Sequence, residues 1–220
     1  MKKAIITISG GIDSTLTAAI AKKDGYELYF LTANYGQRNL KRELENTSFL
    51  ANYYRAKKYK IIELTWLGQL GNSMITDTSI QVDPNNDHQI YVPFRNTCIL
   101  AAAIAWAETD LDIKRIYIGS DGESEDVCPD NSPAYIKSIN ELIKVSTKNN
   151  RNLEVVAPLN HMTKTEIIKK AIEYKIPMEH TWTCVSNSEV ACGLCDPCRA
   201  RKEAFMKLGI KDTIKYNEWA

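Results

Sequence analysis

Residues 9–14, Ser-Gly-Gly-Ile-Asp-Ser, carry the clearest chemical signal in the sequence. They follow an apolar, β-rich run and precede an amphipathic run. Adjacent glycines at Gly10 and Gly11 let the backbone turn tightly and direct successive N–H groups toward one point, which forms a nest for an anion. The following helix adds its positive N-terminal end, with Asp13 or Ser14 as its cap. This segment therefore predicts a cradle for phosphate groups.

The details of this loop exclude two common phosphate-binding motifs. It has no lysine at the position that a Walker-type loop requires, and it lacks the Gly-x-Gly-x-x-Gly spacing of dinucleotide-binding turns. Hydroxyl groups of Ser9, Ser14 and Thr15 can instead supply further donors to the anion. The alternative is a glycine-rich turn between a strand and a helix that binds no ligand.

A second group of reactive side chains lies near the carboxyl terminus. Four of the six cysteines cluster there: Cys184, Cys192, Cys195 and Cys198. Two overlapping Cys-x-x-Cys spacings predict a closed tetrahedral zinc site, in preference to an iron–sulfur cluster or uncoordinated thiols. Because four sulfurs leave no position for water, the zinc would be structural and would pin the tail. Gly193 permits one tight turn and residues 196–197 begin another. We expect His180 to pack beside Trp182 or to face solvent, with a place among the metal ligands as the alternative.

Composition limits the class of protein. The chain has 220 residues, of which 44% are hydrophobic and 25% charged, and its formal net charge is +1. These values are ordinary for a globular protein and argue against strong nonspecific nucleic-acid binding. No signal peptide and no apolar run of about 20 residues is present, so we expect no membrane segment and a cytoplasmic location.

Short β-rich runs alternate with longer helical runs, which predicts an α/β fold with an open, mostly parallel sheet and helices on both faces. The strands are expected at 4–8, 27–31, 60–64, 115–119 and 153–156, and the helices at 14–23, 40–55, 96–108, 133–147 and 164–174. A capping box at 163–166 starts the last helix. We place a nucleotide-binding domain at 1–178 and the small zinc-binding region at 179–220.

Ligands of open parallel sheets bind beyond the carboxyl ends of the strands. The loops at 9–14, 32–38, 120–130 and 157–164 should therefore face one pocket. Residues 68–91 are polar and rich in turn formers, which predicts a loop or lid. Five carboxylates lie close together before the fourth long helix: Asp121, Glu123, Glu125, Asp126 and Asp130.

Several motifs together resemble the 7-cyano-7-deazaguanine synthase family of PP-loop ATP pyrophosphatases, across nearly the whole chain. Besides the loop at 9–14 and the four cysteines, they are Tyr-Gly-Gln-Arg at 35–38, Tyr-Val-Pro-Phe-Arg-Asn-Thr at 91–97, Thr-Lys-Thr-Glu-Ile at 163–167 and Thr-Trp-Thr-Cys at 181–184. The resemblance implies the PP-loop fold, a reaction that uses ATP and Mg²⁺, and a structural Zn²⁺ ion. ATP would adenylate the carboxylate of 7-carboxy-7-deazaguanine, ammonia would give the amide, and a second adenylation with loss of AMP would give the nitrile. It also favours a homodimer.

The resemblance assigns roles to individual residues. The expected ATP-binding residues are Ser9, Gly10, Gly11, Ile12, Asp13, Ser14, Leu31, Thr32 and Arg38. The expected catalytic residues are Asp13, Arg95 and Lys164, of which Asp13 would hold magnesium or orient the loop. Arg95 and Lys164 would face the α-phosphate and the leaving group. Arg38 and Asp130 would bind the deazaguanine substrate, and the unranked candidates for the base are Glu123, Asp126 and Asp130.

Each assignment has a plainer alternative. Arg95 and Lys164 can be surface cations, Asn96 can cap its helix, and Tyr35 and Trp182 are more often core residues than ligand contacts. Two segments also depart from the family pattern, 120–133 and 185–188, where aromatic and glycine positions are missing. These departures keep a second hypothesis open, in which the activated carboxylate is joined to a protein or peptide amine. A PP-loop enzyme that modifies RNA is a third hypothesis, with Cys128 as its only candidate thiol.

Overall fold

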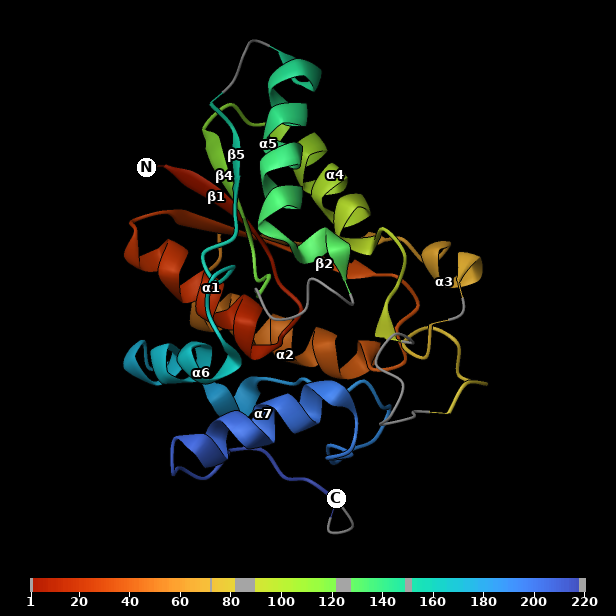
Figure 1. Cartoon of the computed structure of the whole chain (residues 1–220). Helices are drawn as coiled ribbons and strands as arrows, with labels where there is room; N and C mark the ends of the chain where they lie inside the picture. Colours follow the sequence, from red (N-terminus) through yellow and green to blue (C-terminus); the bar gives the residue numbers. More distant parts are fainter. Residues whose placement is uncertain (1, 72, 82–89, 122–127, 149–151, 218–220) are drawn as a thin grey trace.

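A five-stranded parallel sheet forms the centre of the molecule (Figure 1). The computed structural model describes residues 2–71, 73–81, 90–121, 128–148 and 152–217. Its strands are β1 (Lys3–Thr7), β2 (Glu27–Asn34), β3 (Lys58–Glu63), β4 (Ile113–Ile118) and β5 (Glu154–Val156), in the spatial order β3-β2-β1-β4-β5. Every neighbouring pair is parallel. The predicted α/β sheet is therefore confirmed.

Side chains of the central strands alternate between two cores, as the two-residue period of a strand requires. In β1, Ala4 and Ile6 enter one core and Ile5 enters the other. The first core lies beside α1 (Ile12–Lys23), α2 (Leu40–Tyr53) and α6 (Lys164–Glu173), and the second beside α4 (Arg95–Glu108) and α5 (Pro133–Ser146). Figure 1 shows α4 and α5 together on one side of the sheet and α1, α2 and α6 on the other.

All five predicted helices are present, and the capping box of α6 forms as expected, with Thr163 and Glu166 bonded to each other's backbone. The predicted cap of α1 is wrong. Gly11 is the N-cap and makes no side-chain cap, because α1 begins at Ile12 and so places Asp13 and Ser14 inside its first turn. Short helices that we did not predict are α3 (Leu67–Leu70), η2 (Pro129–Asn131) and η4 (Met178–His180).

The carboxyl-terminal region contains α7 (Asp196–Lys207), where the sequence indicated only a turn at 196–197. Phe205 of α7 lies in the same core as β1 and α1. Arg201 is fully buried and donates to both carboxylate oxygens of Asp212, at 2.7 and 2.8 Å, and to the Thr181 hydroxyl at 3.0 Å. This region is thus packed on the sheet domain, and the division after residue 178 stays a prediction.

A membrane span would need a long apolar helix, and the described part of the chain contains no helix that meets this requirement.

Candidate active site and metal centre

The order of the strands determines where a ligand can bind. From β1 the chain adds β2 and β3 on one side of the sheet, and it then adds β4 and β5 on the other side of β1. The point between β1 and β4 is therefore a topological switch point, where a crevice opens beyond the carboxyl ends of the strands. Gly119 directly follows β4 at this point. A Cβ atom at Gly119 would lie 2.7 Å from the backbone nitrogen of Ser14. The glycine therefore lets the loop after β4 run directly against the first turn of α1.

A cavity of about 380 Å³ lies at this crevice. All four loops that we predicted to face one pocket contribute to its lining, which confirms that prediction. The lining includes Ser9, Gly11, Asp13, Ser14, Tyr35, Asp121, Cys128 and Lys164. The start of α7, at Asp196 and Pro197, forms another part of its wall. A cavity of this size is in the range of small-molecule sites.

The turn at 9–14 has the geometry that its glycines predicted. Gly10 has a φ of +76°, and a Cβ there would lie 2.9 Å from the Cβ of Asn46. The Ser14 hydroxyl accepts from the Ser9 backbone N–H at 3.2 Å and donates to the Gly11 carbonyl at 3.2 Å. Thr15 is buried and its hydroxyl donates to the same carbonyl at 2.7 Å. Ser9 and Ser14 therefore lie at the cavity, whereas Thr15 supports the turn from inside.

Lys164 is a bridging cation and is not a solvated surface lysine. Its Nζ donates to both oxygens of Asp13, at 2.9 and 2.8 Å, and to Oδ2 of Asp121 at 2.8 Å. Its side chain is only 17% exposed. Burial by itself would lower the pKa of Lys164, but the charges of Asp13 and Asp121 outweigh burial and raise it. Burial raises the pKa of Asp13, and the charge of Lys164 opposes this effect. Counted as one lysine cation and two carboxylate anions, the three groups have a formal charge of −1.

Arg95 lies at a different part of the cavity wall, where α4 begins. Its guanidinium is 5.4 Å from the centre of the Tyr35 ring, and Nη1 lies 3.5 Å from the Tyr35 hydroxyl. Tyr35 is buried in a core cluster, as its type suggested, and it also lines the cavity. Asn96, the next residue, is inside α4, and its backbone N–H donates to Oδ2 of Asp130 at 2.9 Å. Asp130 is buried and is not among the lining residues described.

Four other residues of the predicted site have clear positions. Leu31 and Thr32 line the cavity at the end of β2, whereas Ile12 is buried behind the turn. The Arg38 guanidinium donates to the carbonyl oxygens of Asp77 and, at 2.9 Å, of Ile80. It therefore holds the segment at 73–81 and does not line the cavity. That segment contributes Ile75 to the wall. Glu123 and Asp126 lie outside the described residues, as do residues 72 and 82–89 of the expected loop or lid.

Sequence reasoning missed several cavity residues. Trp182 lines the cavity, and its backbone N–H donates to the Gly10 carbonyl at 2.8 Å. Its indole Nε1 and the Thr183 hydroxyl are buried polar atoms with no hydrogen-bond partner in the described part of the chain. Such atoms are rare in folded proteins unless a ligand or water completes them. Trp182 was expected in the core, and it does belong to a core cluster. Its place in the cavity wall was missed because the orientation of this segment depends on tertiary contacts.

Cys128, the candidate thiol of an RNA-modifying enzyme, also lies at the cavity. It is buried, and burial raises the pKa of its thiol. A raised pKa reduces the fraction of thiolate, which is the nucleophilic form. Cys128 therefore lines the cavity, but its surroundings do not activate its thiol as a nucleophile.

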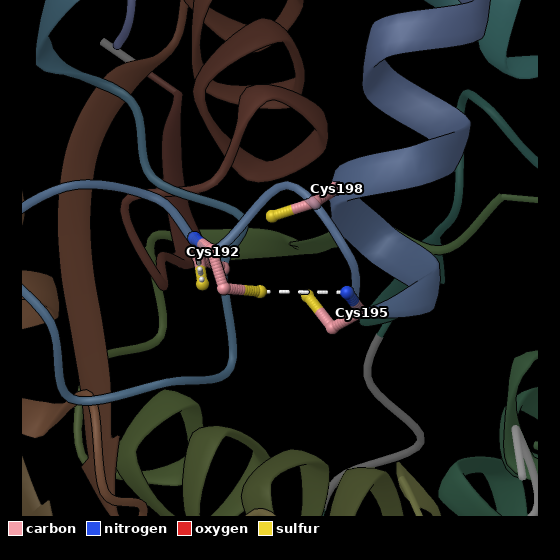
Figure 2. Close-up of side chains that lie close together, drawn as sticks. Cys192, Cys195 and Cys198 are labelled. Atoms are coloured by element: carbon pink, nitrogen blue, oxygen red, sulfur yellow. Dashed lines mark hydrogen bonds between the residues drawn. The ribbon is translucent and has the colours of Figure 1, made fainter. Parts of the chain in front are cut away.

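The four cysteines come together as their spacing predicted. One sulfur atom from each of Cys184, Cys192, Cys195 and Cys198 lies within 4.8 Å of the others. Regular tetrahedral zinc with Zn–S bonds of about 2.3 Å needs sulfur separations of about 3.8 Å. Figure 2 shows Cys198 at the start of α7 with its sulfur directed toward those of Cys192 and Cys195.

Backbone N–H groups point at two of these sulfurs. Cys184 Sγ accepts from Cys192 N at 3.3 Å and from Ser186 N at 3.4 Å, and Cys192 Sγ accepts from Cys195 N at 3.4 Å (Figure 2). Such donors stabilise thiolates, which are the form that binds metal. The Asn39 side-chain amide also donates to the Cys184 carbonyl at 3.0 Å, which joins the cluster to the start of α2. His180 stacks on Phe49, with ring centres 3.5 Å apart. The donor set is therefore four sulfurs.

Two solved structures share the fold of this chain. NMN synthetase from Francisella tularensis has a TM-score of 0.52 and 14% identity, with 96% of this chain and 78% of that chain covered. A 4-thiouridine synthetase solved as an RNA complex with bound ATP has a TM-score of 0.51 and 18% identity, with 93% and 53% covered. At these identities the similarity concerns the fold alone.

Sequence comparison goes further. The family model described as queuosine biosynthesis protein QueC matches residues 3–209. Proteins named 7-cyano-7-deazaguanine synthase are 39% identical in Chlorobium chlorochromatii (97% of this chain, 96% of that protein) and 38% identical in Nautilia profundicola (99% and 100%). The chain therefore belongs to the QueC family of queuosine biosynthesis enzymes.

Proposed function

We propose that this enzyme converts 7-carboxy-7-deazaguanine into 7-cyano-7-deazaguanine with ATP and ammonia, releasing AMP and pyrophosphate. The observation that carries the proposal is one cavity, in a chain of this family, that combines the glycine turn at 9–14 with Lys164 and Arg95. A carboxylate is a poor acyl donor until its oxygen becomes part of a better leaving group. Attack of the carboxylate on the α-phosphate of ATP gives an acyl adenylate and satisfies that need.

The turn at 9–14 would bind the pyrophosphate that leaves. Backbone N–H groups around Gly10 and Gly11, the hydroxyls of Ser9 and Ser14, and the N-terminal end of α1 all favour an anion there. Ile12 would contribute through its backbone, since its side chain is buried. Leu31 and Thr32, at the end of β2, would receive the adenine.

Lys164 would balance the charge that develops on the leaving group, and Arg95 would face the carboxylate or the α-phosphate. Asp13 holds Lys164 in place, and Asp13 and Asp121 would also hold a magnesium ion, which would supply charge neutralisation to the phosphates. Two carboxylates around one ammonium leave the negative charge that such a cation needs. Four sulfurs would hold a structural zinc ion beside the cavity wall.

The deazaguanine would lie against the wall formed by Trp182 and Thr183, whose buried polar atoms need partners. Asp130 remains a candidate for this substrate, although its described partner is the Asn96 backbone, so we infer that it first positions the start of α4. Arg38 also remains a candidate for substrate binding, because the segment at 73–81 that it holds contributes Ile75 to the cavity wall. The homodimer and the cytoplasmic location stay predictions.

The test is a product assay with 7-carboxy-7-deazaguanine, ATP, Mg²⁺ and ammonium, read by mass spectrometry. We expect nitrile together with AMP, and none of either from Lys164→Met. Release of AMP without nitrile would contradict the proposal. A mass added to a supplied peptide or to the enzyme itself would instead favour the amine-conjugating alternative.

A further inference from the structure

Glu43 is a buried carboxylate in the cavity wall to which the proposed reaction has given no role. It lies in the first turn of α2, its residue is 8% exposed, and it lines the cavity. Burying a carboxylate is costly unless hydrogen bonds replace its water. Two amides do so here: Gln37 Nε2 donates to Oε2 at 2.8 Å, and Asn39 Nδ2 donates to Oε1 at 3.3 Å.

Both amides are fixed by the backbone around them. The Gln37 side chain accepts from the Tyr35 N–H at 2.9 Å and donates to the Ala33 carbonyl at 2.9 Å. The Asn39 amide also bonds to the Cys184 carbonyl, as described above. A carboxylate oxygen has two lone pairs, so one amide on each oxygen leaves Glu43 able to accept again. The carboxylate is therefore held rigidly at the cavity without being saturated.

The charge around Glu43 suits a group that gains and loses a proton. Within the described ranges, no lysine or arginine lies at ion-pair distance from it; the groups that face it are Arg95 from α4 and the Tyr35 phenol after β2. Burial raises the pKa of Glu43 to about 7, and the two amides and Arg95 oppose burial only in part. A base works best when its pKa lies near the working pH.

In the described part of the chain, the other carboxylates that line the cavity each have a cationic partner. Asp13 and Asp121 bind Lys164, and Asp196 Oδ1 lies 3.5 Å from Arg199 Nη2. Asp130 accepts from the Asn96 backbone and does not line the cavity. Glu43 was missed in the sequence because a glutamate in the first turn of an amphipathic helix usually faces solvent. Here the turn at 35–38 and Gly10 bring α2 against the cavity, and the Glu43 carbonyl lies 3.4 Å from where a Gly10 Cβ would be.

We propose that Glu43 accepts the proton that the attacking ammonia must lose when the amide forms. This inference rests on the proposed function. Ammonia nitrogen forms a bond to the carbonyl carbon of the acyl adenylate, and the bond from that carbon to the phosphate oxygen breaks. AMP leaves with the electron pair, and one proton passes from nitrogen to the Glu43 carboxylate, then to water. Adenylation, which precedes this step, does not need Glu43.

The test uses full-length Glu43→Gln and three rates at pH 7.5. The first is the exchange of labelled pyrophosphate into ATP that depends on 7-carboxy-7-deazaguanine, which reports adenylation alone. The second is amide formation with ammonium. The third is hydroxamate formation with hydroxylamine, whose nitrogen is more acidic after attack and loses its proton to water without help.

We expect Glu43→Gln to exchange pyrophosphate at a rate within about threefold of the unmodified enzyme and to slow amide formation by about 10²-fold or more. Hydroxamate formation should fall by much less than amide formation. Equal losses with both nucleophiles, or an unchanged amide rate, would overturn the proposal. A merely structural role would give equal losses, since it would not distinguish the two nucleophiles.

Glu43→Asp is the second variant, because it keeps a carboxylate if Gln at this position disturbs the fold. It should retain exchange and regain part of the amide rate relative to Glu43→Gln, whereas an Asp variant that slows ammonia and hydroxylamine alike would overturn the proposal. Failure of the proposed function has a different signature: the unmodified enzyme itself would then show no exchange that depends on the carboxylate.

Discussion

The cysteine cluster and the lysine bridge are both gatherings of charged or chargeable groups, but they are built in opposite ways. The four cysteines lie within 15 positions of one another, and their sulfurs form a closed set. The bridge of Lys164 joins three distant parts of the chain, the first turn of α1, the loop after β4 and the first turn of α6, and it lies at the open cavity. The site that needs an empty position for its ligand is assembled from distant segments, whereas the site that only fastens the chain is local.

Lys164→Met should break the bridge and have the largest effect. It would leave Asp13 and Asp121 without their shared cation at the point where pyrophosphate must leave, so we expect AMP release to fall by about 10³-fold or more. AMP release from ATP in the presence of the carboxylate substrate measures this.

Lys144→Met is the matched control, because Lys144 forms only an exposed ion pair with Glu141 on α5. Its rate should stay within about twofold of the unmodified enzyme. Similar losses in the two variants would show that the bridge has no special part in the reaction.

Cys195→Ser tests the other side of the comparison. Loss of one sulfur should lower the zinc content and the midpoint of thermal unfolding, because zinc binding contributes free energy of about 10–16 kcal/mol in small zinc peptides. Metal analysis and calorimetry measure the two quantities. Cys98→Ser, at a half-buried position on α4, should change neither. Unaltered zinc in Cys195→Ser would refute the four-sulfur site.

Gly10→Ala tests the turn at 9–14 at the open cavity. An alanine there must adopt a φ near +76° and place its Cβ 2.9 Å from Asn46 Cβ. Gly25→Ala has the same strain, with φ +83°, but nothing within 4 Å of the added atom. We expect Gly25→Ala to lower the free energy of unfolding by about 1–2 kcal/mol and Gly10→Ala to lower it further. Urea unfolding measures both.

ATP affinity separates these two glycine variants again. It should weaken only in Gly10→Ala, because only that turn lies at the cavity. Equal affinity losses would point to a general effect on the fold.

The last prediction concerns the pH-dependent stability cost of Glu43. Its pKa is about 7 in the folded chain against an ordinary 4.5, so the folded state binds the proton more tightly. Stability from this group is therefore present at low pH and is lost as the pH rises from 4.5 to about 7. We therefore compare the free energy of unfolding of Glu43→Gln with that of the unmodified chain at two pH values. Between pH 4.5 and a pH above 7, this difference should shift in favour of the variant by up to about 3 kcal/mol. Urea unfolding across this range measures the gain, and a difference that does not change with pH would contradict it.

Local patterns predicted much of this molecule. The alternation of strand and helix patterns predicted the parallel sheet, the glycines at 10 and 11 predicted the turn, and the cysteine spacing predicted the cluster. Lys164 was identified by its motif, but its contact with Asp121 was not, since that contact brings the loop after β4 against the first turn of α6.

The remaining differences have the same origin. Arg38 follows a strand and was expected at the ligand, yet it binds carbonyl groups of the segment at 73–81. α7 was missed because its start at 196–197 also reads as a turn, and Phe205 finds its core only through long-range packing. Glu43 and Trp182 became cavity residues through contacts between distant elements, which no local pattern encodes.

The most direct test of the central claim is the position at which ATP is cleaved. Incubation of the enzyme with ATP labelled at the α-phosphate, 7-carboxy-7-deazaguanine and ammonium should yield labelled AMP, with unlabelled pyrophosphate in equal amount. Labelled ADP, or no turnover of ATP when the carboxylate is present, would contradict the account.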